Sequence, residues 1–174
     1  NANTGALTFV SGRDRENHTD ADSNGIYEVS VAASDGTLTD TQNISVTITD
    51  VDEFDVTLPT DTDAADNEVD ENVAIGTAVG IAANAFDSDA TNNTVSYSLT
   101  TNPDGLFQID ANTGVITTAA AIDRELHGAS RSITVQATSA DGSTQTQTFN
   151  IAVNDLDEFD VTLPTDTDAA DNEV

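Results

Sequence analysis

The sequence predicts an all-β protein made of tandem Greek-key β-sandwiches, with about seven strands in each repeat. Apolar and polar residues alternate in several short runs, which is the pattern of strands with one buried face. Turn-forming Asp-Gly and Asn-Thr-Gly sequences separate these runs. An 18-residue segment, DEFDVTLPTDTDAADNEV, occupies 52–69 and recurs 105 residues later at 157–174. The chain is therefore predicted to be an array of similar domains.

The first two strands are predicted in the N-terminal third of the chain. Apolar residues take alternate positions over 27–31 and again over 44–48, and Ser34-Asp35-Gly36 lies between the two runs. An Asp-Gly pair between two alternating runs is typical of a β-turn. These residues should form a pair of half-buried strands.

The next strands are predicted from the same alternation. Val95, Tyr97 and Leu99, for example, fall on one face of a run whose other face carries Thr and Ser. No segment shows a helical period. The predicted strands of this region lie near 55–58, 73–83, 94–100, 106–109, 114–118, 131–138 and 145–153.

The repeat period fixes the expected domain organisation. A period of 105 residues is too long for a solenoid and matches one small domain with its own core. At a similar offset, Asn-Thr-Gly occurs at 3–5 and 112–114, and Asp-Arg-Glu at 14–16 and 123–125. We expect 1–50 to be the C-terminal part of one repeat, 51–155 a complete repeat and 156–174 the start of a third, within a longer molecule.

Composition excludes several classes of partner. The chain has 32 Asp and Glu against four Lys and Arg, for a net charge of −28. Such a chain repels nucleic acid and anionic lipid, because both bind through cationic side chains. No run approaches the roughly 18 apolar residues of a membrane helix, so we expect no membrane insertion. Without Cys, small domains with this much like charge need another stabiliser, and metal ions are the first candidate.

Short motifs follow one another along the complete repeat. They are Asp-Glu-Asn at 70–72, Ala-Phe-Asp-Ser-Asp at 85–89, Val-Ser-Tyr-Ser-Leu at 95–99, Phe-Gln-Ile-Asp-Ala-Asn-Thr-Gly-Val-Ile at 107–116, Asp-Arg-Glu at 123–125, Ala-Asp-Gly at 140–142 and Asn-Asp-Leu-Asp-Glu at 154–158. In this order they resemble cadherin repeats, and their variation around one identical junction resembles the giant adhesins and surface proteins of bacteria. The resemblance implies an extracellular location.

Paired acids in this sequence suit calcium. Ca²⁺ takes six to eight oxygen ligands, and an Asp-x-Asp pair in extended chain points both carboxylates the same way. The resemblance implies that three such pairs converge at the first junction together with three further positions. This predicted first set is Asp14, Glu16, Asp50, Asp52, Glu53, Asp87, Asp89 and Asp141, with Asn92 or Asn93 nearby.

A second set is predicted at the second junction. It comprises Glu71, Asp123, Glu125, Asp155, Asp157 and Glu158. Phe54 and Phe159 stand where a cadherin linker carries an Asn ligand, which puts one calcium position at each junction in doubt. Two further acidic clusters, at 20–25 and 60–68, are either calcium loops or solvated polar turns.

Two function classes follow. The first is a calcium-rigidified structural or adhesive repeat of a long secreted or surface protein, in contact with neighbouring repeats and with other copies in a filament or surface layer. The alternative is a carbohydrate-binding module with glycans as partners, which the absence of Trp disfavours. His18 and His127 lack a second His or Cys for a zinc site. No catalytic motif is present, and we expect no enzymatic activity.

Overall fold

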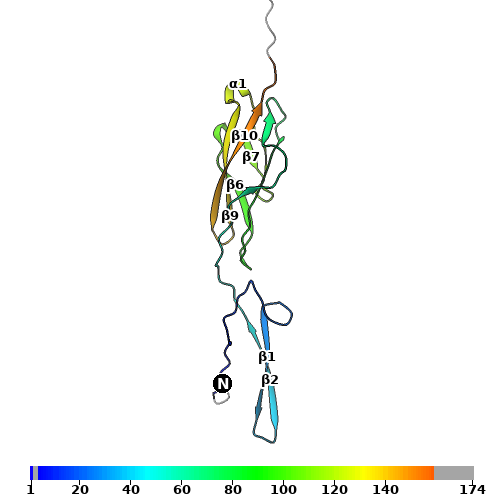
Figure 1. The fold of residues 1–174 in the computed structure, drawn as a ribbon, viewed down its shortest axis with the longest axis vertical. Helices are drawn as coiled ribbons and strands as arrows, with labels where there is room; N and C mark the ends of the chain where they lie inside the picture. The colour runs from blue at the N-terminus through cyan, green and yellow to red at the C-terminus, as the bar shows by residue number, and fades with distance from the viewer. Residues whose placement is uncertain (2–3, 159–174) are drawn as a thin grey trace, which may run out of the picture.

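The computed structural model describes residues 1 and 4–158 and confirms the all-β prediction. A two-stranded hairpin precedes a pair of four-stranded sheets. Figure 1 shows the hairpin and the two-sheet sandwich arranged end to end, joined by an extended linker. No helix in the described residues is long and apolar enough to cross a bilayer.

The hairpin consists of β1 (Ile26–Ser34) and β2 (Thr39–Thr47). The strands are antiparallel, with Val29 opposite Ile44. Asp35 closes the turn, because its Oδ1 accepts the backbone N–H groups of Thr37 and Leu38, each at 2.8 Å. The alternation predicted over 27–31 and 44–48 therefore forms one apolar face.

The first sheet of the sandwich has the strand order β4-β10-β9-β6. Its members are β4 (Glu68–Asp70), β6 (Val95–Thr101), β9 (Ser130–Ser139) and β10 (Thr144–Asn154). The long antiparallel pair β9 and β10 forms its centre. The short strand β4 is parallel to β10. The first strand of this sheet in chain order therefore lies beside the last.

The second sheet has the order β3-β5-β8-β7. It is built from β3 (Thr60–Asp61), β5 (Ala78–Asn84), β7 (Phe107–Ile109) and β8 (Val115–Thr118). Alternate residues of both sheets face each other and exclude water, which makes the core the main source of stability. The most deeply buried members are Val79, Ile116, Ile133, Val135, Ala137 and Ile151.

The structure corrects two local predictions. Residues 55–58 are not a strand. Val56 is buried, and the Thr57 N–H donates to the Phe86 carbonyl at 2.8 Å. The next residue with a chance to extend this pairing, Pro59, has no N–H to donate. The predicted strand over 73–83 starts only at Ala78.

Two short helices were also not predicted, namely η1 (Pro103–Gly105) and α1 (Arg124–His127). Asp123 caps α1, because its Oδ1 accepts the Leu126 N–H at 2.8 Å. Four residues are too few to show a helical period, so neither helix could have been read from alternation.

Gly114 provides a test of the packing between β5 and β8. It has φ +70, and a Cβ at this position would lie 1.9 Å from the Ala83 carbonyl oxygen. Gly105 has nearly the same φ, +64, with nothing within 4 Å of its Cβ position. A positive φ costs an L-residue about 1–2 kcal/mol. We expect Gly114→Ala to lower the free energy of unfolding clearly more than Gly105→Ala, as measured by urea denaturation. Equal losses would show that the close approach does not matter.

Candidate metal centre

Acidic side chains gather at both ends of the sandwich. Three groups of carboxylates have one oxygen from each member within 4.8 Å of the others. Two of these groups share Asp89 and lie at the end that faces the hairpin, and the third lies at the opposite end. The groups are Glu16, Glu53 and Asp89; Asp52, Asp89 and Asp141; and Glu71, Asp123 and Glu125.

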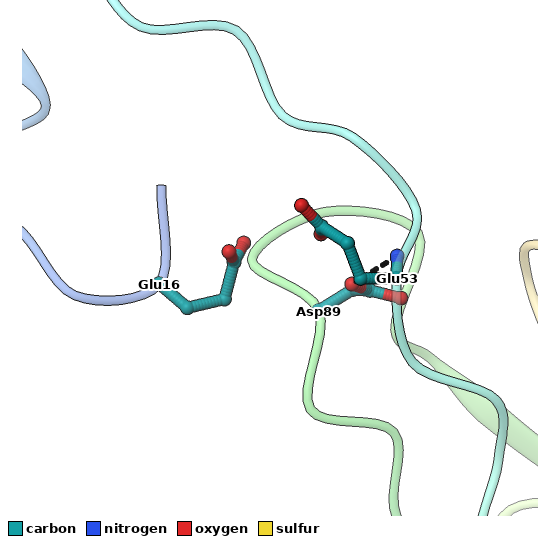
Figure 2. A group of neighbouring side chains, drawn as sticks. All are labelled: Glu16, Glu53 and Asp89. Carbon is teal, nitrogen blue, oxygen red and sulfur yellow. Dashed lines mark hydrogen bonds between the residues drawn. The ribbon is translucent and has the colours of Figure 1, made fainter. Parts of the chain in front are cut away.

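The group of Glu16, Glu53 and Asp89 joins three parts of the chain. Figure 2 shows Glu16 reaching from the N-terminal region toward Glu53 of the linker and Asp89 of the loop after β5. The Glu53 backbone N–H donates to Asp89 Oδ1 at 3.2 Å. The Ala90 N–H donates to Glu16 Oε1 at 3.1 Å. The three side chains are therefore positioned by backbone hydrogen bonds that cross from one segment to another.

The loop that carries Asp87 and Asp89 is anchored at both ends. On one side, the hydroxyl of buried Tyr97 accepts a hydrogen bond from the Ala85 N–H at 2.9 Å. The same hydroxyl donates a hydrogen bond to the Ala85 carbonyl at 3.2 Å. On the other side, the Ser139 hydroxyl donates to the Asn92 carbonyl at 3.1 Å. Both side chains come from strands of the first sheet, so the sandwich core fixes the position of the loop.

Asp87 and Asp89 are themselves buried, with exposed fractions of 8% and 3%. The Ser139 hydroxyl and the Asp89 backbone N–H hold the pKa of Asp87 below its usual value. Asp87 is thus kept ionised in a place with little access to water. A buried carboxylate of this kind needs a compensating positive charge or several hydrogen bonds.

The linker acids respond differently to their surroundings. Burial, followed by the charge of Asp141, raises the pKa of Asp52. Burial also raises the pKa of Glu53, with the charge of Asp89 as the next cause. Both shifts show that this position disfavours further negative charge and would favour a cation.

Asp50 and Asp14 complete the first end. Asp50 Oδ2 accepts the Thr91 N–H at 2.9 Å and also the Thr91 hydroxyl. The Thr91 hydroxyl holds the pKa of Asp50 low, while the side-chain hydrogen bond with Asp50 raises the pKa of Glu16. Asp14 Oδ1 accepts the Glu16 N–H at 2.9 Å, and its charge contributes to the raised pKa of Glu53.

Several buried carboxylate oxygens in this region accept no hydrogen bond. They are Asp50 Oδ1, Asp87 Oδ2 and Asp141 Oδ2. A buried carboxylate oxygen without a hydrogen bond costs folding free energy. Three such oxygens near one loop leave negative charge uncompensated, and a bound cation would compensate it. This observation shows that the residues at the first end fit a hard cation.

The opposite end is organised around Glu71, whose exposed fraction is 1%. Its two carboxylate oxygens accept the Arg124 N–H at 2.6 Å and the Leu156 N–H at 2.7 Å. The backbone N–H of Glu125 lowers the pKa of that residue, but burial and the charge of Glu71 outweigh it and raise the pKa overall. Here too negative charge accumulates.

The remaining members of the second predicted set lie around this group. Asp155 forms an ion pair with Arg124 at 3.1 Å. Glu158 accepts a hydrogen bond from the Asn72 side chain at 2.8 Å. The charges of both acids also act on the pKa of Glu125. Asp157 is exposed and belongs to none of the three carboxylate groups.

The two ambiguous acidic clusters form turns closed by their own hydrogen bonds. Asp20 Oδ2 accepts the N–H groups of Asn24 at 3.0 Å and Gly25 at 2.7 Å. Asp61 Oδ1 accepts the Asp63 N–H at 3.0 Å. Neither cluster contributes to a carboxylate group among the described residues.

Sequence reasoning missed Thr91 and did not settle the role of Asn93. Asn93 donates its side-chain amide to the Asp89 carbonyl at 2.6 Å. Phe54, 47% exposed, donates only its backbone N–H to Asp89 Oδ2, at 3.3 Å. Phe159 lies outside the described residues. His127 Nδ1 accepts the Asp123 N–H at 3.1 Å, and neither His18 nor His127 joins a metal-binding group in the described part of the chain.

Comparisons with known proteins agree on one family. The family model "Cadherin domain" matches residues 66–154. Human cadherin-7 is 37% identical over 124 residues, which cover 70% of this chain and 15% of that protein. Cadherin-20 of Xenopus laevis is 41% identical over 92 residues, 52% of this chain and 11% of that protein. The chain thus spans less than a sixth of the length of these relatives.

Solved structures show the same fold. The protocadherin GammaB4 extracellular domain is 27% identical, with a TM-score of 0.62 over 85% of this chain and 22% of that one. The EC1–4 fragment of the protocadherin PcdhgB3 has a TM-score of 0.67 at 22% identity, over 85% of this chain and 35% of that one.

Glu71 allows a test of how the second end is held. Replacing its carboxylate with an amide in Glu71→Gln leaves one of two backbone N–H donors without an acceptor. Such a loss costs about 1–3 kcal/mol of folding free energy. Urea denaturation in chelator should show this loss, whereas Glu68→Gln, an exposed change on β4, should show almost none. Equal stability of the two variants would contradict the assigned role of Glu71.

Proposed function

Because the chain belongs to the cadherin family, we propose that it is a calcium-rigidified structural repeat of a long extracellular adhesion protein. Cell adhesion and calcium binding are typical of this family. The proposal for this chain rests on one observation above all. Carboxylates from the N-terminal region, the linker and the sandwich converge at the first end, and three of their buried oxygens accept no hydrogen bond.

The chemistry of these residues favours Ca²⁺ over other ions. Every side-chain ligand on offer is a hard oxygen, and the donor set contains no Cys or His. Glu16, Glu53 and Asp89 would hold one ion, and Asp52, Asp89 and Asp141 another, with Asp14, Asp50 and Asp87 completing the shells. A bound Ca²⁺ supplies the positive charge that allows these acids to stay close together. At the opposite end, Glu71, Asp123 and Glu125 would hold the corresponding ion.

The domain boundaries belong to the same proposal. Residues 51–155 would be one complete repeat, with 1–50 and 156–174 belonging to its neighbours. In support, the hairpin matches the β9–β10 pair of the sandwich in its turn sequence, Ser-Asp-Gly against Ala-Asp-Gly. The apolar positions of β9 and β10 are covered by the second sheet, whereas Val31 and Ile44 of the hairpin remain 38% and 36% exposed.

The setting of the parent protein is a further part of the proposal. A bacterial surface adhesin or filament is compatible with the repeat structure, but the relatives named above are vertebrate proteins and give that origin no support. The adhesive role would make neighbouring repeats and other copies the natural partners. Glycan binding stays an alternative prediction, with Phe9, Phe54 and Phe86 as the exposed Phe side chains among the described residues.

Calcium removal tests the proposed function. An ion that binds only the folded state adds about 2.7 kcal/mol per site at a hundred times its Kd. We expect millimolar Ca²⁺ to raise the Tm by about 10 °C or more over chelator. Mg²⁺ at equal concentration should raise it less, because Mg²⁺ requires near-ideal octahedral geometry and dehydrates reluctantly.

Two variants sharpen this experiment. Asp89→Asn removes an acid shared by two carboxylate groups and should abolish most of the Ca²⁺-dependent rise. Asp110→Asn removes an acid that serves only the β7–β8 turn, where its Oδ1 accepts the Asn112 N–H at 2.9 Å, and should keep the rise. If Ca²⁺ leaves the wild-type Tm unchanged, the proposed function fails.

A further inference from the structure

Two successive residues of the loop after β5 bind acids from other parts of the chain. The Ala90 N–H donates to Glu16 Oε1 at 3.1 Å, and the Thr91 N–H donates to Asp50 Oδ2 at 2.9 Å. The Thr91 hydroxyl donates to the same Asp50 oxygen. Successive backbone N–H groups in a turn form a concave surface that favours anions. This loop therefore binds one acid from the N-terminal region and one from the start of the linker.

The turn around Thr91 is closed by contacts within the sandwich. Asn92 has a φ of +54, in the left-handed region that Asn adopts more readily than most residues. Its carbonyl accepts the Ser139 hydroxyl at 3.1 Å. The Asn93 side-chain amide donates to the Asp89 carbonyl at 2.6 Å. None of these bonds involves the linker, so the sandwich itself presents the Thr91 donors.

Asp50 is bound through one of its two carboxylate oxygens. Oδ2 accepts both hydrogen bonds from Thr91, whereas Oδ1 is buried and accepts none. Two donors on one oxygen restrict rotation of the carboxylate, so the other oxygen keeps one direction. The Asp50 carboxylate also interacts with Glu16 and with Glu53, two acids of one carboxylate group. The unpartnered oxygen of Asp50 is thereby kept beside that group.

Repulsion opposes this position of Asp50. Neighbouring carboxylates repel one another, and an Asp side chain has two rotatable bonds through which it can turn toward water. Among the described residues, Thr91 supplies both of the hydrogen bonds that Asp50 accepts. Thr91 therefore holds the Asp50 carboxylate against the repulsion of its neighbours.

We propose that Thr91 is a positioning residue for the cation site at the first end, and that it acts by aiming the unpartnered oxygen of Asp50 at the ion. The inference rests on the proposed function, because a bound cation is what would give that oxygen a partner. Replacing a residue that hydrogen-bonds a metal ligand typically lowers metal affinity by about 10- to 100-fold. Thr91 thus raises the affinity of the site without contacting the ion.

The loop offers a matched set of variants. Thr91 is exposed, so Thr91→Val removes the hydroxyl and keeps the side-chain shape without opening the core. Thr91→Ser keeps a hydroxyl that can donate to Asp50. Thr94 is also exposed and is not a hydrogen-bond partner of Asp50. Thr94→Val is therefore the control for a lost hydroxyl in the same loop.

A Ca²⁺ titration of the full chain tests the role of Thr91. With a competing chelator present, the NMR amide signals of Asp89 and Glu71 report the two ends of the sandwich separately. We expect Thr91→Val to weaken binding at Asp89 about tenfold, and Thr91→Ser to restore most of it. Any binding at Glu71 should be the same in every variant, and Thr94→Val should match the wild type at both ends. Wild-type affinity in Thr91→Val would overturn the inference.

A double-mutant cycle shows whether Thr91 acts through Asp50. Asp50→Ala removes the acceptor, so adding Thr91→Val to that variant should lower the Ca²⁺ affinity no further. Additive losses would mean that the hydroxyl contacts the ion itself or acts elsewhere, and the inference would be wrong.

Stability without the ion separates positioning from a structural role. In urea and chelator, Thr91→Val should unfold at nearly the same denaturant concentration as the wild type. A lower midpoint together with an unchanged Ca²⁺ affinity would make Thr91 a structural residue only and overturn the inference. If the wild-type chain binds no Ca²⁺ at either end, the proposed function has failed and this inference fails with it, whereas the other outcomes leave the proposed function intact.

Discussion

The mutual repulsion of the carboxylates at the first end is the constraint on which the rest of the structure depends. Two carboxylates about 4 Å apart repel by roughly 4 kcal/mol at an effective dielectric near 20. Core residues nevertheless force them together: Tyr97 and Ser139 anchor the Asp87–Asp89 loop, and the linker N–H groups of Glu53 and Phe54 reach Asp89. The sandwich thus stores a repulsion that a cation can relieve.

Under the proposed function, this arrangement would allow so acidic a chain to form an ordered array. Ions between neighbouring repeats would then neutralise the acids at the ends, so the charge that destabilises each repeat alone would help to hold the repeats together. Within 55–154, the acids outside the two end clusters are those of the 55–70 segment together with Asp104 and Asp110. The positions of the acids, more than the net charge, would then determine whether neighbouring repeats can lie together.

Sequence alone predicted much of this because the signals were local. Alternation located β6, β9 and β10 within two residues, since one buried face imposes a period of two. It failed at 55–58, where a single backbone hydrogen bond from Thr57 to Phe86, followed by Pro59, replaces a ladder. The family resemblance brought Asp14, Asp52 and Asp141 into one set. Thr91 could not be found in this way, because its contact with Asp50 depends on how two loops meet across 41 residues.

We propose that cations fix the hairpin region relative to the sandwich. Because the chain contains no Cys, spin labels can be attached at two introduced sites, Thr41→Cys on β2 and Thr146→Cys on β10. Double electron–electron resonance would then report the distribution of distances between them. We expect a narrow distribution in Ca²⁺ that broadens in chelator and stays broad in Asp89→Asn. A distribution of equal width with and without Ca²⁺ would contradict it.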